Sequence, residues 1–104
     1  AMRLGAECFG VIAKWPVARA EHWRALTIAR AIENQAIVAA CNRTGSDPHW
    51  SYGGGSLIVD AKGCVLAEGG TEPAVVSAEV DVAGMRAWRA AFPALGDVRA
   101  DLLG

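Results

Sequence analysis

Cysteine is scarce in this chain of 104 residues, and its three cysteines form no recognisable site. Cys8, Cys41 and Cys64 are widely spaced and include no C-x-x-C pair, while His22 and His49 have no carboxylate or second histidine at ligand spacing. Neither a disulfide framework nor a zinc site is therefore predicted. We expect cysteines that are reduced and mostly buried, no metal and no cofactor.

Segments that would direct the chain to a membrane are also lacking. No apolar stretch approaches the roughly 20 residues needed to cross a bilayer. The first ten residues, in which Glu7 interrupts the apolar character, make a poor signal peptide. We expect a cytoplasmic protein without a membrane partner.

A surplus of basic charge is absent too. The chain has 10 Lys and Arg against 11 Asp and Glu, and the basic residues form no stripe, which excludes a nucleic-acid partner. Apolar residues are abundant instead: 53% of the chain is AVILMFWYC, and 21 residues are alanine. A chain of this length is one domain at most. Either it has an alanine-rich core, or its apolar faces are normally covered by more protein.

The first half of the chain predicts two strands joined by a helix. Residues 8–13, CFGVIA, form a continuous apolar run typical of a strand covered on both faces. Residues 20–35 contain no Gly or Pro and predict a helix, with Trp23, Leu26 and Glu33 on one stripe. Residues 36–41, AIVAAC, predict a second buried strand.

The second half predicts a hairpin, a strand and a short helix. Residues 44–55 are rich in Gly, Ser, Asp and Pro and predict a loop. In residues 56–68 two apolar stretches flank a turn that contains Gly63, which predicts a hairpin. Residues 74–81 predict another strand and residues 82–91 a helix, before an irregular tail. The order β-α-β-β-β-β-α indicates a layered α/β fold.

Several stretches together resemble the C-terminal portion of the carbon–nitrogen hydrolases, the nitrilase superfamily, and within it the small-amide branch that contains ω-amidases. They occur in order over nearly the whole chain: AKWPVAR (13–19), HWRALTIARAIENQAIVAACNRTGSD (22–47), YGGGSLIVDAKGCVLAE (52–68), AEVD (78–81) and RAAFPALGDVRADL (89–102).

The resemblance implies a fold, a chemistry and an omission. It implies part of an α-β-β-α sandwich, with residues 1–104 as a single partial domain. It also implies hydrolysis of a small non-peptide amide: a Cys thiolate attacks, a Glu moves protons and a Lys stabilises the oxyanion, without a cofactor. In the family all three residues precede the stretch that this sequence matches, so no catalytic residue is expected here.

Cys8 is not a convincing substitute for the missing nucleophile. Glu7 precedes it, but adjacent residues of a regular strand point to opposite faces, so Glu7 cannot act as its base. Free cysteine is more often a buried small hydrophobe.

Three residues are candidates for contact with substrate. The resemblance implies that the A-x-W-P segment passes the nucleophile at the carboxyl end of a strand, which makes Lys14 and Trp15 candidates for lining the pocket, with Tyr52 a weaker one. The alternatives are a solvated charge for Lys14 and a packing anchor for Trp15.

Five further polar residues are interpreted as structural. Arg30, Glu33 and Asn34 lie on one side of the predicted helix end, within reach of a salt bridge or hydrogen bonds to the next strand. Asn42 and Asp47 would fasten the exit of that strand and its loop, since short polar side chains bond to turn backbone.

Three hypotheses remain for the whole chain. It is a C-terminal hydrolase segment that is inactive alone, a self-associating pseudoenzyme or interaction module, or one half of a split hydrolase completed by a separate N-terminal half. Half of a two-sheet sandwich leaves an apolar face and strand edges uncovered, so we expect a homo-oligomer.

Overall fold

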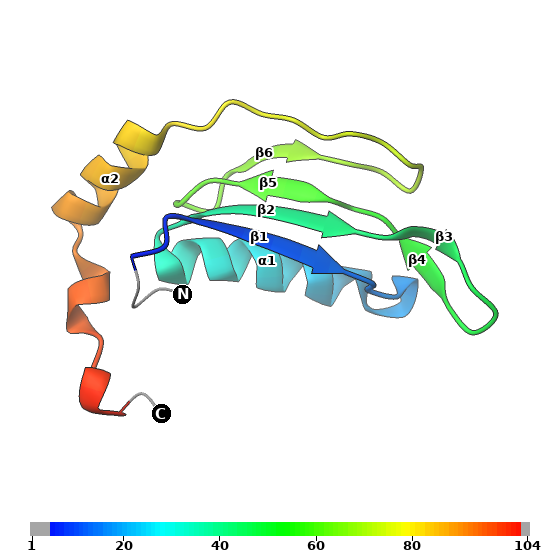
Figure 1. Cartoon of the computed structure of the whole chain (residues 1–104), viewed down its shortest axis with the longest axis horizontal. Coiled ribbons are helices and arrows are strands. Elements are labelled where there is room, and N and C mark those ends of the chain that lie inside the picture. The colour runs from blue at the N-terminus through cyan, green and yellow to red at the C-terminus, as the bar shows by residue number, and fades with distance from the viewer. Residues whose placement is uncertain (1–4, 103–104) are drawn as a thin grey trace.

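Parallel pairing of two apolar strands through one helical crossover organises the fold. The structure is a computed structural model that describes residues 5–102. Strands β1 (Cys8–Ala13) and β2 (Ile37–Asn42) run parallel from Cys8 beside Ile37 to Ala13 beside Asn42, and α1 (Ala20–Asn34) connects them. Figure 1 shows α1 along one face of the sheet. The strands predicted at 8–13 and 36–41 and the helix predicted at 20–35 are therefore confirmed, the last two within a residue.

The sheet continues with the predicted hairpin. Strands β5 (Leu57–Val59) and β6 (Val65–Glu68) are antiparallel, and β5 pairs with β2, which gives the order β1-β2-β5-β6. The turn between them has Gly63 at φ +87°, where a side chain is disfavoured. Oδ1 of Asp60 accepts hydrogen bonds from the backbone N–H groups of Lys62 and Cys64, each 2.9 Å long.

The segment predicted as a loop at 44–55 contains a second, smaller hairpin, so that prediction is wrong in part. Strands β3 (Thr44–Ser46) and β4 (Ser51–Gly53) pair antiparallel. They have three residues each and mostly polar composition, which is why no alternation of apolar residues revealed them.

The strand predicted at 74–81 is not formed. The apolar and polar residues there alternate as in a strand, but Pro73 has no N–H, and within residues 5–102 no backbone hydrogen bond joins 74–80 to a neighbouring strand. Figure 1 shows this segment as an extended connection from β6 to α2. A strand requires a partner as well as a pattern, and the described chain supplies none.

Helix α2 (Val82–Ala91) lies at the end of the sheet where β1 and β2 begin (Figure 1). Oδ1 of Asp81 caps it by accepting a hydrogen bond from the N–H of Gly84. The guanidinium of Arg86 pairs with both carboxylate oxygens of Glu7, at 2.7 and 2.9 Å. Arg89 donates to the backbone carbonyls of Ala6, Asn34 and Gln35 and so ties α2 to the end of α1. After Pro93 the chain forms two single 3₁₀ turns, η3 (Ala94–Asp97) and η4 (Ala100–Leu102).

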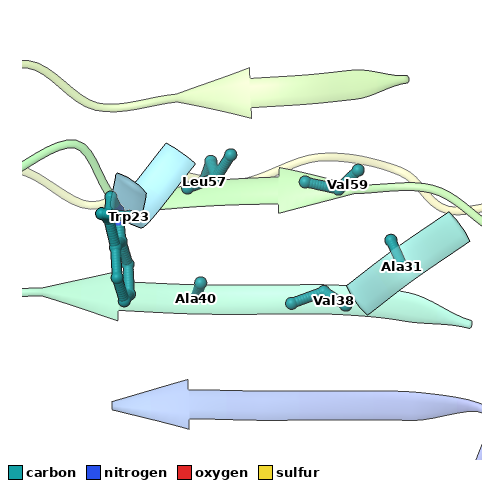
Figure 2. Packing of buried hydrophobic residues seen from close by; sticks show 6 residues of the cluster. All are labelled: Trp23, Ala31, Val38, Ala40, Leu57 and Val59. Carbon is teal, nitrogen blue, oxygen red and sulfur yellow. The ribbon is translucent and has the colours of Figure 1, made fainter. Parts of the chain in front are cut away.

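The core lies between α1 and the two central strands. Figure 2 shows its six buried side chains, which α1, β2 and β5 contribute in pairs: Trp23, Ala31, Val38, Ala40, Leu57 and Val59. The predicted stripe of α1 is wrong beyond Trp23: the buried residues are Trp23, Thr27 and Ala31, and the side chains of Leu26 and Ile32 are exposed. Thr27 and Ala31, which follow Trp23 by four and eight residues, are small and let the helix approach the sheet. A hydrophobicity pattern favours large apolar residues and does not reveal that small ones face the core.

The face of the sheet opposite α1 is open except near α2, where Ile37 is buried and lines a cavity with Met85 and Trp88. Strand β1 was expected to be covered on both faces, but Ile12 is 92% exposed and no strand within residues 5–102 pairs with the outer edge of β1. The expectation that the cysteines are mostly buried is also wrong, since all three are exposed. Cys8 and Cys41 alternate with residues that face α1 and therefore lie on the open face, while Cys64 lies beside the β5–β6 turn.

Truncation of a core residue should destabilise the chain far more than truncation of an exposed one. We expect Val59→Ala, at a fully buried position, to lower the free energy of unfolding by about 2–3 kcal/mol. Val75→Ala, at a position 97% exposed, makes the same chemical change and should have an effect within about 0.5 kcal/mol. Urea unfolding followed by tryptophan fluorescence measures both, and equal losses would contradict this packing.

Candidate functional site

The candidate site lies where the parallel strands β1 and β2 end. Open α/β sheets bind ligands outside the carboxyl ends of their parallel strands. Lys14 and Trp15 follow β1 directly, and Asn42 and Arg43 end and follow β2. Figure 1 shows the hairpin β3–β4 at this same end of the sheet. A backbone bridge between Pro16 and Tyr52 joins the two loops.

The buried side chain of Asn42 holds these segments together. Its Oδ1 accepts a 2.7 Å hydrogen bond from the backbone N–H of Trp15, and its Nδ2 donates to the carbonyls of Trp15 and Gly54 at 3.2 and 2.8 Å. The backbone N–H of Asn42 donates to Oγ of Ser56. One amide therefore connects the loop after β1, the end of β2 and the glycine run before β5.

Asp47 organises the β3–β4 hairpin. Its Oδ1 accepts from the backbone N–H groups of His49 and Trp50, at 2.9 and 2.8 Å, and its Oδ2 accepts from the hydroxyl of Tyr52. Arg43 Nη1 lies 3.5 Å from Oδ2. The Tyr52 hydroxyl, the two backbone N–H groups and Arg43 together lower the pKa of Asp47 from 3.8 to about 2. The same hydrogen bond to Asp47, aided by burial, raises the pKa of Tyr52.

A cavity of about 350 Å³ opens beside this hairpin. We call it the Lys14 cavity, and it is lined by Lys14, Pro16, Arg19, Asp47, His49, Trp50 and Tyr52. Nζ of Lys14 lies 6.0 Å from the centre of the Tyr52 ring, and Cζ of Arg43 lies 4.5 Å from it. These distances suit cation–π attraction. The arrangement can receive a small polar ligand between cations and aromatic walls.

The three substrate-lining candidates separate into two groups. Lys14 and Tyr52 line the Lys14 cavity together. The indole of Trp15 packs instead against the core, with its ring 6.0 Å from that of Trp23 and its Nε1 donating to the carbonyl of Arg19. The contacts of Trp15 are those of a packing anchor.

The five residues interpreted as structural lie at opposite ends of the sheet. Arg30 and Glu33 form a 2.6 Å ion pair, and Asn34 donates to the carbonyl of Arg30, but the pair is exposed and remains within α1. Asn42 and Asp47 lie at the candidate site. Sequence reasoning missed Arg19, Arg43 and Arg89. Arg43 directly follows Asn42 in the stretch CNRTGSD, and this adjacency was the available signal. Nothing in the sequence indicates the long-range contacts of Arg89.

The carboxylate next to Cys8 is occupied by another contact. The carboxylate of Glu7 accepts hydrogen bonds from Arg86, and these bonds lower the pKa of Glu7. Among residues 5–102, no group of three or more His, Cys, Asp and Glu side chains could hold a metal ion. Neither helix in that range has the length and apolar character needed to cross a membrane.

Comparison with known proteins identifies the family. The carbon–nitrogen hydrolase family model matches residues 5–90. The chain belongs to the carbon–nitrogen hydrolase family. It is 50% identical to the 2-oxoglutaramate amidase of Bacillus subtilis over 94% of this chain and 38% of that protein. It is 47% identical to the ω-amidase YafV of Yersinia enterocolitica over 88% of this chain and 37% of that protein.

Solved structures share the fold of this chain. The superfamily protein XC1258 of Xanthomonas campestris, which carries an arsenic adduct in its active site, superposes with a TM-score of 0.86 at 37% identity, over 94% of this chain and 37% of that one. The NitFhit protein of Caenorhabditis elegans gives a TM-score of 0.86 at 31% identity, over 99% and 26%. The predicted nitrilase-like α/β fold is confirmed. The chain spans less than two-fifths of the length of each of these relatives and solved structures.

The low pKa of Asp47 predicts an acid-sensitive contribution to stability. Because the folded-state pKa, about 2, is below the ordinary 3.8, this contribution is present above pH 3.8 and is lost as the pH falls through 2. We expect Asp47→Asn to unfold at a lower temperature than the wild type at pH 6, and the difference to shrink between pH 4 and pH 2.

Thermal unfolding by circular dichroism measures this difference. Glu72→Gln, which neutralises an exposed carboxylate, is the matched control and should follow the wild type at pH 6. A difference between Asp47→Asn and wild type that is unchanged at pH 2 would show that the charge of Asp47 does not stabilise the hairpin.

Proposed function

We propose that this chain is the C-terminal part of an amidohydrolase that cleaves the carbon–nitrogen bond of a small ω-amide. The observation that carries the proposal is the 50% identity to a 2-oxoglutaramate amidase over 94% of the chain. The Lys14 cavity, at the strand ends where α/β proteins bind ligands, supports it. In this proposal the chain contributes a substrate-facing wall of the active site rather than the nucleophile.

The nucleophile, the proton-transferring glutamate and the oxyanion-stabilising lysine would come from protein outside this sequence. The proposed reaction is attack of a Cys thiolate on the amide carbon, loss of ammonia and hydrolysis of the thioester. Cys8 lacks a base, because the carboxylate of the adjacent Glu7 is paired with Arg86. The 104 residues alone should therefore be inactive.

The open face of the sheet supports a need for further protein. Ile12 on β1 is 92% exposed, and the neighbouring strand presents the exposed Ala39 and Cys41 on the same face. An apolar sheet face and an unpaired edge promote association. We propose that the N-terminal part of a hydrolase covers this face, in the same polypeptide or as a separate half, and that the isolated chain self-associates through it.

The same open face favours one alternative, a non-catalytic interaction module that works as a homo-oligomer. Under the hydrolase proposal and under this alternative alike, we expect a cytoplasmic protein, in which the three free cysteines would stay reduced.

Ammonia release separates these proposals. We expect none from the purified chain with glutaramate or succinamate, because the carboxylate of Glu7, the residue beside Cys8, is paired with Arg86. Co-expression with the part of the Bacillus subtilis amidase that precedes the matched region should yield a complex that releases ammonia. The control is the same complex in which the nucleophilic cysteine of the Bacillus subtilis part is changed to alanine.

Two outcomes would contradict the proposal. Release by the chain alone that disappears in Cys8→Ala would show that it has built its own site. A stable complex without activity would favour the interaction module over the hydrolase part.

Self-association through the open face has its own test. Light scattering at micromolar concentration should show a homo-oligomer for the wild type. Ile12→Asp should shift it toward monomer, because burying an unpaired charge in an apolar interface is costly. Val75→Asp introduces the same charge at another exposed β-branched residue, outside the sheet, and should leave the oligomer intact. A monodisperse wild-type monomer would refute the proposal.

A further inference from the structure

The Lys14 cavity has positive charge available to a ligand and no free negative charge. Its charged lining residues are the cations Lys14 and Arg19 and the anion Asp47. An ionised carboxylate offers about four acceptor positions. Those of Asp47 face two backbone N–H groups, the Tyr52 hydroxyl and Arg43. The Asp47 carboxylate is fully engaged by its own hairpin.

The N–H donors of Lys14 and Arg19 remain available to a ligand. Lys14 lies over the ring of Tyr52 and Arg19 over the ring of Trp15, with Cζ 5.6 Å from the ring centre. A cation–π contact orients a cation without consuming its N–H groups. Within residues 5–102 neither side chain forms an ion pair. Both cations are exposed, so they remain accessible to a ligand.

The walls suit a short carbon chain that ends in an anion. Trp50, which is 54% exposed, and the ring of Tyr52 provide aromatic surface, and His49 adds a polar ring at the edge. A volume of about 350 Å³ is at the small end of the range for ligand pockets. A compact ligand with one carboxylate and a few methylene groups fits this combination.

We propose that Lys14 and Arg19 bind the carboxylate of the substrate and thereby select amides that carry a negative charge at the end opposite the scissile bond. This inference rests on the proposed amidohydrolase function. It assigns Lys14 and Arg19 to specificity, with no part in the bond-breaking chemistry.

Titration of the full chain with glutaramate and pentanamide, followed by ¹H–¹⁵N NMR, tests the inference. Pentanamide replaces the carboxylate of glutaramate with a methyl group and keeps the amide and the chain length. We expect glutaramate to produce saturable shifts around Lys14, Arg19 and Tyr52, with weakening at higher salt. Pentanamide should bind at least about twofold more weakly, as expected for the loss of exposed ion pairs.

Matched variants assign the effect to residues. Lys14→Gln and Arg19→Gln should each weaken glutaramate binding about two- to fivefold and leave pentanamide unchanged. Lys62→Gln is the control, because Lys62 also lies over an aromatic ring, that of Trp88, but outside the cavity. It should bind glutaramate as the wild type does.

Several results would overturn the inference. These are equal affinity for the two amides, no saturable shift with either, or no effect of Lys14→Gln and Arg19→Gln. Equal affinity for inorganic phosphate would show a general anion site and contradict selection of a carboxylate. None of these results would affect ammonia release by the co-expressed complex, so failure of this inference is distinguishable from failure of the proposed function.

Discussion

The side-chain amide of Asn42 is the interaction on which the geometry of the candidate site depends. It is 6% exposed, and its oxygen and both N–H groups are hydrogen-bonded, to Trp15 and Gly54. A buried polar group left without a partner costs about 1–3 kcal/mol. Removing this amide would leave buried backbone groups unpaired in two loops at once. The loop that carries Lys14 is thereby fixed to the end of β2, and the Pro16–Tyr52 bridge then brings it to the β3–β4 hairpin.

The fold is half enclosed, and this asymmetry connects structure to proposed function. Helix α1 buries one face of the sheet through Trp23, Thr27 and Ala31, while Ile12 on the other face is in contact with solvent. In the proposed function, the N-terminal part of a carbon–nitrogen hydrolase covers this open face. Stability, association and activity would then all depend on whether the open face is covered by further protein.

Sequence patterns located the regular elements well where apolar periodicity and breakers coincide. The strand at 8–13, the helix ended near Gln35 and the hairpin turn at Gly63 are examples. The strand predicted at 74–81 failed because pairing is a tertiary property. The exposed cysteines were misjudged because alternation along a strand shows that two faces exist but not which one is covered.

The candidate site was predictable in part for related reasons. Lys14, which follows β1, and Tyr52, which lies on β4, line one cavity. The ion pair between Arg43 and Asp47 depends on the β3–β4 hairpin. The position of Arg19 over the ring of Trp15 depends on η2 (Val17–Arg19). Both elements are too short to give a periodic signal in the sequence. The carbonyl contacts of Arg89 connect residues more than 50 positions apart and have no sequence signature.

The most direct measurement is hydrogen exchange at the amide of Trp15 in the wild type and in Asn42→Ala. That N–H donates to Oδ1 of Asn42, whereas the N–H of Ile37, at the opposite end of the β1–β2 pair, donates to the carbonyl of Glu7. We predict that exchange at Trp15 accelerates much more than exchange at Ile37, because the loop is released while the sheet persists. Equal acceleration at both amides, or continued protection of Trp15, would contradict the central role of Asn42.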